Sequence, residues 1–136
     1  MSTKATVRNK LDDSKFATVW LEVSNDPEGF RIGSLLNEEA VHEVVSPEGQ
    51  AHQGRTFAAW ESACYSGVFY IRKRARNDLL AVVITRIAGL LERGDSTGFA
   101  VAASAAFLGE MGLALEMSEK DLAGWKIEKV ERDQAG

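Results

Sequence analysis

The stretch FATVWLEV at residues 16–23 alternates between the two sides of an extended chain. Val19, Leu21 and Val23 share one side, and Trp20 lies on the other. A period of two with β-branched and aromatic residues is typical of a strand in a half-buried sheet. The stretch therefore predicts a β-strand whose apolar side faces the core and whose second side carries Trp20.

The segment after this strand is predicted to contain a turn and further short elements. Asp26 and Pro27 are the residue types of a helix N-cap and a first helical position, which favours a short helix. Two glycines weaken that helix, so a strand over residues 29–36 is the alternative. Further strands are predicted at Val41–Val45, 55–65 and 68–73.

The clearest helical pattern lies in the second half of the chain. A cap at Asn77 or Asp78 precedes apolar residues at three- and four-residue spacings, and Arg93-Gly94 ends the pattern. The recurring residues are Leu80, Val83, Ile84, Ile87, Leu90 and Leu91. This spacing predicts the main helix that packs on the sheet.

The residues after this helix are predicted to form two strands, a short helix and an edge strand. Alternation predicts strands over 98–107 and 113–117. Ser118 with Asp121 three residues later resembles a capping box, which predicts a short helix. The last edge strand is expected over 127–130.

These elements predict an α+β fold, ferredoxin-like or related. It would be a two-layer sandwich of a mostly antiparallel sheet with helices packed on one face. No repeat, linker or low-complexity tract divides the chain, so residues 1–136 are predicted to form a single domain. The ordered core is expected at about 15–130, with loose ends at 1–14 and 131–136.

The composition is that of an ordinary globular protein. Of the 136 residues, 45% are hydrophobic and 26% are charged, which argues against a disordered chain. The net charge of −4 argues against a general nucleic-acid binder, because phosphate attraction needs a basic surface. The first residues lack a signal-peptide core, and the apolar stretch at 79–91 is too short to span a bilayer. We therefore expect a cytoplasmic protein that makes no membrane contact.

Four short motifs run through the chain: VSNDPE at 23–28, the pair Leu35-Leu36, a Gly54-Arg55 start leading to Trp60, and Leu115-x-Met117-Ser118 followed by Leu122. Together they resemble a small uncharacterised bacterial α+β domain family, of the kind also carried on mobile gene cassettes. The chain departs from that pattern after Trp60, where Glu61-Ser62 replaces an immediate serine. The resemblance implies the fold class and no catalytic residue.

The residue types that carry chemistry form no catalytic or metal-binding motif. His42, His52 and Cys64 are the only soft ligands and lack the close pairs of a zinc site, so no metal and no cofactor are predicted. A nucleophilic Cys64 would need His42 within hydrogen-bond reach. A packed, buried Cys64 is favoured, and a small enzyme using Glu61 or Cys64 with His42 is kept as an alternative.

Four cations fall within residues 72–76, and three of them are Arg72, Arg74 and Arg76. This basic run fits an acidic protein partner or an anionic small molecule. Placed before the predicted main helix, the run would lie at an N-terminus, where the macrodipole disfavours cations. That cost suggests that acidic side chains pair with these cations.

Three aromatic residues are predicted to lie on adjacent strands. Trp20, Trp60 and Tyr70 would then wall an apolar pocket rimmed by Arg55 or Arg72. The competing interpretation places the tryptophans in the core or half-buried.

These features predict a non-enzymatic binding or interaction domain. It would self-associate as a homodimer through an exposed strand edge or the aromatic side of the sheet. The candidate binding residues are Trp20, Arg55, Trp60, Tyr70, Arg72, Arg74 and Arg76. A pocket for an anionic amphipathic small molecule is the second hypothesis, the small enzyme is the third, and nucleic-acid binding is the least favoured.

Overall fold

The computed structural model describes residues 2–12, 15–35, 41–45, 55–75, 79–90, 97–113 and 116–133. Four strands come first, and helices then alternate with the last two strands. The elements are β1 (Ser2–Asn9), β2 (Phe16–Asn25), β3 (Arg31–Ser34), β4 (Val41–Val45), α1 (Arg55–Ile71), η1 (Arg72–Ala75), β5 (Leu80–Leu90), α2 (Thr97–Glu110), α3 (Glu119–Leu122) and β6 (Trp125–Asp133).

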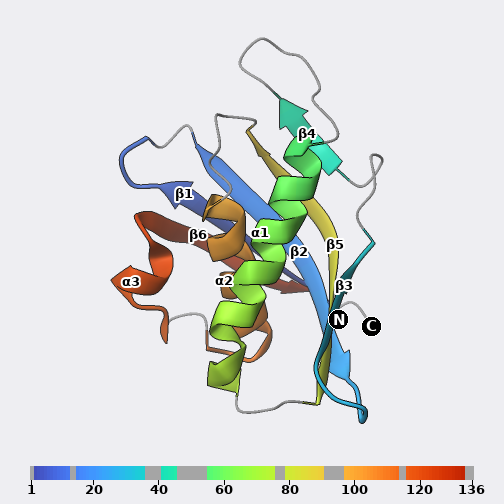
Figure 1. The fold of residues 1–136 in the computed structure, drawn as a ribbon. Helices are drawn as coiled ribbons and strands as arrows, with labels where there is room; N and C mark the ends of the chain where they lie inside the picture. The colour runs from blue at the N-terminus through green and yellow to red at the C-terminus, as the bar shows by residue number, and fades with distance from the viewer. Residues whose placement is uncertain are drawn as a thin grey trace.

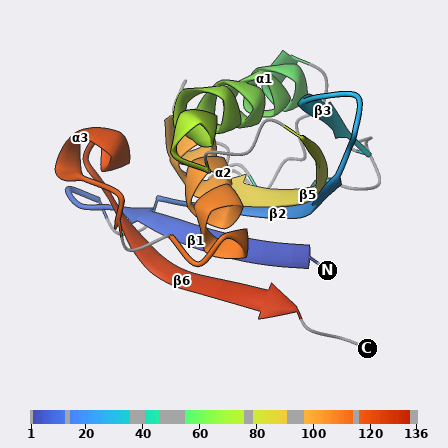
Figure 2. The same cartoon turned by 90° about the horizontal axis from the view of Figure 1, so that it is seen from below.

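The strands form one six-stranded sheet in the order β3-β5-β2-β1-β6, with β4 also paired to β5 (Figure 1). The pairs β1–β2, β1–β6 and β2–β5 are antiparallel, whereas β3 and β4 run parallel to β5. Helix α2 packs on β1, β2 and β6, and α1 packs on α2 from the same side of the sheet (Figure 2). The predicted α+β sandwich with a mostly antiparallel sheet is confirmed.

The first strand corrects the expectation of a loose N-terminal end. Ser2–Asn9 forms β1, which pairs with β2 on one side and β6 on the other. Thr3, Ala5 and Val7 are fully buried. Two of these three side chains are small, so the strand lacks a strongly apolar pattern. The chain past residue 130 is also ordered, because β6 continues to Asp133.

Helix α1 replaces the strands predicted over 55–65 and 68–73. Its buried side chains are Trp60, Cys64, Val68 and Ile71, spaced three or four residues apart. This is the stripe of a helix that covers a core on one side. The local alternation of aromatic and alanine residues around Trp60 masked it.

Strand β5 replaces the predicted main helix, and a β-bulge explains the error. Leu80, Val82 and Ile84 point into the core, but the register shifts opposite Trp20 and Leu21, so that Ile87 is the next core residue. A bulge inserts one residue and moves the inward phase by one position. The resulting three-residue step from Ile84 to Ile87 imitates helical spacing.

Helix α2 replaces the strand predicted over 98–107. Every residue from Gly98 to Gly109 except the half-buried Ala100 is buried, because α2 lies between the sheet and α1. A helix that is buried on every side has no polar face and therefore no helical period in its hydrophobicity. Its alanines and glycines permit this close packing. An alanine at Gly98, for example, would bring its Cβ to 2.7 Å from the Trp125 ring.

The strand predicted over 113–117 is also wrong, because its described residues Leu113, Glu116 and Met117 do not lie in a strand, and Glu116 N donates to Leu113 O at 3.0 Å. Gly112 has φ +74°, and Leu113 N donates to Leu108 O at 2.7 Å, which is a helix-terminating arrangement. Part of the predicted strand, Leu115, lies outside the described residues.

Four local predictions are confirmed, and one alternative is decided. Strands β2 and β4 form where predicted, and β6 is an edge strand. Ser118 caps α3 in a complete capping box with Asp121. Residues 31–34 form β3, so the strand alternative holds and the helix after Asp26 is wrong; the Asp26 carboxylate instead accepts from Glu28 N at 2.9 Å in a turn.

Candidate binding surface on the open sheet face

The sheet has one side that no helix covers within the described residues. We call it the open face, and it consists of the side chains that β1, β2, β5 and β6 direct away from α2 (Figure 2). Strand pairing fixes their positions, because Lys4 lies opposite Trp20 on one side and Glu131 on the other. Trp20 lies in turn opposite Arg86 of β5.

Trp20 is the half-buried centre of the open face. Lys4 Nζ lies 5.2 Å from the centroid of its ring, and the Arg86 guanidinium carbon lies 4.7 Å from it. The two cations come from the strands on either side of β2. Cations at these distances are attracted to the face of the indole ring.

A second aromatic residue continues this arrangement along β2. Phe16 is half-buried on the same side as Trp20, and the Arg8 guanidinium carbon lies 5.6 Å from its ring centroid. Arg8 also pairs with Glu128 of β6 at 3.0 Å. The open face therefore carries an aromatic stripe along β2 flanked by cations.

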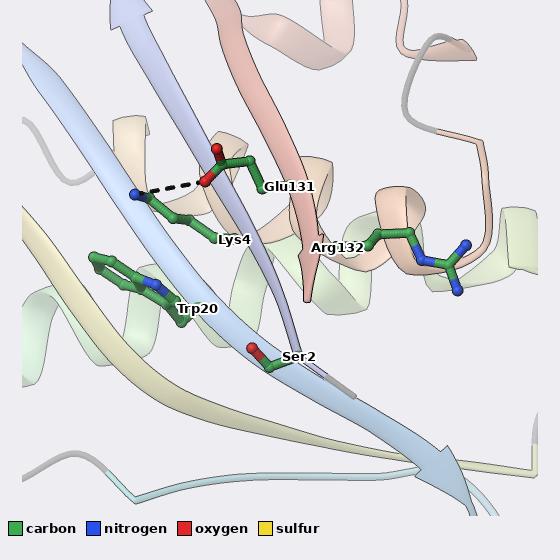
Figure 3. Close-up of a pocket in the computed structure, with 5 residues that line it drawn as sticks. All are labelled: Ser2, Lys4, Trp20, Glu131 and Arg132. Atoms are coloured by element: carbon green, nitrogen blue, oxygen red, sulfur yellow. Dashed lines mark ion pairs between the residues drawn. The ribbon is translucent and has the colours of Figure 1, made fainter. Parts of the chain in front are cut away.

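An open depression with a volume of about 590 Å³ lies beside Trp20. Its lining residues are Ser2, Lys4, Trp20, Glu131 and Arg132 (Figure 3). Lys4 and Glu131 point toward one another, 3.8 Å apart, whereas the Arg132 side chain points away from Trp20. A hydrogen bond from Lys129, with further help from Lys4, lowers the pKa of Glu131. The depression is thus lined by an indole ring, an ammonium group and an ionised carboxylate.

The aromatic residues expected beside Trp20 lie elsewhere. Trp60 is buried in the core on α1, stacked on Phe99 with ring centroids 4.2 Å apart. Tyr70 is exposed near the end of α1. Helix α1 lies on the side of the sheet opposite the open face (Figure 2). The predicted pocket walled by Trp20, Trp60 and Tyr70 on adjacent strands is therefore wrong, because two of its walls belong to a helix.

The basic run does not precede a helix but follows one. Arg72 and Arg74 lie in η1, directly after the C-terminus of α1, where the macrodipole favours cations. The electrostatic cost expected at an N-terminus is therefore absent. Arg76 lies outside the described residues, as does the side chain of Arg55, whose backbone begins α1.

Arg74 is bound within the protein by a buried carboxylate. Its guanidinium donates to both oxygens of Asp121, at 2.5 and 2.9 Å, and Tyr70 Oη donates to Oδ1 at 2.8 Å. Ser118 N donates to Oδ2 at 2.8 Å. Arg74 above all, with the Ser118 and Tyr70 bonds, holds the pKa of Asp121 well below its usual range. These contacts fasten α3 to the end of α1 and account for the charge of Arg74.

The residues considered for catalysis do not form a reactive group in the described structure. Cys64 is fully buried, and burial, with the charge of Glu61, raises the pKa of its thiol. A shielded thiol with a raised pKa stays protonated and lacks nucleophilic character. Glu61 accepts a hydrogen bond from Ser34 Oγ at 2.6 Å. The side chain of His42 and the whole of His52 lie outside the described residues.

The described residues contain neither a cluster of metal ligands nor a helix that could span a membrane. No three His, Cys, Asp or Glu side chains in this part of the chain gather closely enough to hold a metal ion. None of its helices combines the length and the apolar character needed to cross a membrane.

Comparison with known proteins identifies no family. No family model matches the chain, and no curated protein matches it significantly in sequence. The resemblance to a bacterial α+β domain family therefore stays a prediction.

The sequence interpretation missed Lys4 and Arg86, which flank Trp20. Residues 2–9 alternate between small inward side chains and the outward Lys4, Thr6 and Arg8, and this alternation was the available signal. Arg86 was hidden because β5 was assigned to a helix.

Proposed function

We propose that this chain is a non-enzymatic interaction domain that forms a homodimer through the open face of its sheet. The observation that supports it is the half-buried Trp20 at the centre of a sheet side that no described helix covers. Aromatic and arginine side chains are enriched among the residues that dominate binding energy at interfaces. Trp20 would be the main anchor, with Phe16 beside it.

The charge pattern of the open face favours a second copy as the occupant. Glu22 lies toward one end of the face, where β1 begins, and Lys126 lies toward the other. Neither of these two side chains has an ion-pair partner among the described residues, whereas Glu131 pairs with Lys4 and Arg8 pairs with Glu128. A two-fold axis that lies between two sheets, perpendicular to the strands, would place the Glu22 end of one copy over the Lys126 end of the other. Complementary charges of this kind fix the register of an interface.

The β6 edge of the sheet is a poorer route to self-association. The edge strand β6 carries charges at five of its first eight positions, among them Lys126, Glu128 and Lys129, and its pairing with β1 contains a bulge. Charged side chains and bulges on an edge strand oppose the addition of another strand. The open face is therefore the better interface of the two.

Replacing Trp20 by alanine tests this proposal. Loss of a central aromatic anchor should weaken dimerisation about thirtyfold or more. Sedimentation equilibrium measures the dimerisation constant. Protein concentrations from about 1 to several hundred μM cover the range of common dimer affinities. Phe69→Ala is the matched control, because it removes an exposed aromatic ring from α1 and should leave the constant unchanged.

Urea unfolding of both variants separates binding from folding. The proposal requires that Trp20→Ala stays folded and becomes monomeric at concentrations where the unmodified protein is dimeric. An unmodified protein that is monomeric throughout, or a Trp20→Ala variant that dimerises as tightly, would contradict it.

The depression beside Trp20 supports a second candidate function, the binding of an anionic amphipathic small molecule. Its volume of about 590 Å³ lies within the range of small-molecule sites. The indole of Trp20 offers an apolar surface, and Lys4 offers a cation. This site replaces the pocket expected from Trp20, Trp60 and the arginines.

An anilinonaphthalene sulfonate is a suitable probe, because it combines aromatic rings with one negative charge. We expect saturable binding with a change in Trp20 fluorescence, and an affinity about tenfold lower in Lys4→Gln, since charged hydrogen bonds contribute more than neutral ones. Lys126→Gln, which removes an equal charge elsewhere on the open face, should leave the affinity unchanged. Equal affinity in the unmodified protein and Lys4→Gln would exclude this site.

A further inference from the structure

A second surface cluster, of two half-buried side chains and one exposed ring, lies on the helical side of the molecule, away from the open face. We call it the Arg72 cluster, and it consists of Phe30, Phe69 and Arg72. Phe69 belongs to α1, Phe30 to the turn before β3, and Arg72 to η1. The two phenyl rings lie 5.7 Å apart at an angle of 55°.

Both rings hold the guanidinium of Arg72. Its central carbon lies 4.5 Å from the ring centroid of Phe30 and 5.6 Å from that of Phe69. A guanidinium group that rests on aromatic rings keeps its N–H donors at its edge. The rings therefore fix the orientation of a group that binds carboxylate or phosphate through two parallel hydrogen bonds.

No carboxylate neutralises Arg72 within the part of the chain that the structure describes. The acids of the adjacent turn, Asp26 and Glu28, pair with Arg31 instead. Asp121 pairs with Arg74. Lys73, which is exposed next to Arg72, likewise has no acidic partner among the described residues. Arg72 and the adjacent Lys73 thus carry two positive charges that no described acid neutralises, in a chain whose net charge is −4.

The cluster and the neighbouring Tyr70 expose aromatic surface to solvent. Phe69 is 48% exposed, and its neighbour Tyr70 is 53% exposed. Aromatic and arginine side chains are enriched among the interface residues that contribute most of the binding energy. Rings that project in this way suit an extended protein segment, because small molecules need a concave site that covers most of their surface.

We propose that the Arg72 cluster is a docking surface for an acidic segment of another protein. A glutamate or aspartate of that segment accepts two hydrogen bonds from Arg72, and a neighbouring apolar side chain packs on Phe69. Lys73 attracts the rest of the acidic segment. Because α1 lies on the side of the sheet opposite the open face, a dimer formed through that face would leave one such surface accessible on each copy (Figure 2).

The test uses a fluorescein-labelled peptide that alternates glutamate with leucine and phenylalanine, and a matched peptide with glutamine in place of every glutamate. Fluorescence anisotropy measures the affinity of the full chain for each peptide. Nuclear magnetic resonance shifts of the backbone amides then show where the peptide binds. We expect binding of the acidic peptide alone, with shifts centred on Phe69, Tyr70 and Lys73.

Substitutions assign the interaction to the guanidinium. Arg72→Gln should lower the affinity for the acidic peptide about tenfold or more, because charged, bidentate hydrogen bonds are lost. Arg72→Lys keeps the charge without the planar group, so its affinity for the acidic peptide should lie between those of the unmodified protein and Arg72→Gln. Lys120→Gln, which removes an equal exposed charge from α3, outside both surfaces, is the matched control and should bind like the unmodified protein.

The outcomes separate this proposal from the dimer. Loss of peptide binding in Arg72→Gln with an unchanged dimerisation constant supports the Arg72 cluster, whether or not Trp20 mediates dimerisation. Equal binding of the acidic and glutamine peptides, equal affinity in Arg72→Gln, or shifts centred on Trp20 would overturn it. If the same backbone amides shifted without peptide as the protein concentration rose, a second copy of the chain would be the occupant. That result would also overturn the proposal.

Discussion

Replacing Gly67 by alanine is expected to destabilise the protein by about 3 kcal/mol or more, and to leave much of it unfolded at 37 °C. Gly67 lies where α1 crosses α2. A Cβ at this position would overlap the carbonyl oxygen of Ala100 and lie 2.8 Å from its carbonyl carbon. The obstacle is backbone, so no side-chain rotation relieves it. The two helices would have to move apart.

The same crossing contains a buried hydrogen bond that depends on the close approach. Ser104 Oγ, on α2, donates to Gly67 O at 2.8 Å. Separating the helices to fit an alanine would lengthen this bond and open space along both helices. Ser104 Oγ can still donate to Ala100 O on its own helix, 2.9 Å away, so losing the bond to Gly67 adds only about 1 kcal/mol to the cost of the overlap.

Urea unfolding at 25 °C measures the effect, with Gly33→Ala as the control. A Cβ on Gly33 meets nothing within 4 Å, so that variant should differ from the unmodified protein by less than about 0.5 kcal/mol. If Gly67→Ala lost less than about 1 kcal/mol, α1 and α2 could not be as close as described.

Asp121→Asn should produce the second large effect, a loss of about 2–3 kcal/mol in the free energy of unfolding at pH 7. The Asp121 side chain is 1% exposed, and it accepts hydrogen bonds from Arg74, Tyr70 and Ser118 N. An asparagine keeps the shape but loses the charge and one accepting oxygen. Arg74 is 39% exposed and can turn to water, which limits the loss.

The effect of this substitution should depend on pH, and its sign follows from the pKa of Asp121. The folded-state pKa lies below the usual value near 3.9, so the unfolded chain binds this proton more readily. The stabilisation is therefore complete above about pH 5 and is lost progressively as the pH falls through about 4 toward the folded-state pKa. The difference between the two proteins should shrink accordingly in acid.

Unfolding of both proteins between pH 7 and pH 2, from about three units above the usual aspartate pKa to about two units below it, measures this dependence. Glu119→Gln removes an exposed carboxylate from the same helix and should change the stability by less than about 0.5 kcal/mol at any pH in that range. A difference between the unmodified protein and Asp121→Asn that stayed constant down to pH 2 would show that the charge of Asp121 contributes nothing.

The candidate surface was predicted only in part, and for a specific reason. Trp20 was placed on the second side of its strand from alternation alone, and β2 bears this out. Trp60 and Tyr70 were joined to it because 55–73 was assigned to strands, whereas this segment is α1 and η1. The flanking cations Lys4 and Arg86 come from strands that were not recognised, so strand pairing alone brings them to Trp20.

The interactions that the sequence determined by itself are local ones. The alternation of residues 16–23 specified β2, and the Ser118–Asp121 pair specified the start of α3, because each depends on neighbours within a few residues. The predicted α+β class is confirmed, although three of the elements from which it was predicted, α1, β5 and α2, had been assigned to the wrong type.

Only tertiary structure decided whether two of the segments form a helix or a strand. The surroundings of one segment are alike on every side, and those of the other change along its length. Helix α2 is enclosed by the sheet and α1, so no polar face reveals its period. Strand β5 changes its inward phase at a bulge that exists only in its pairing with β2. In both, the pattern in the sequence follows from contacts with distant residues, and so the open face around Trp20 could be recognised only after those contacts were known.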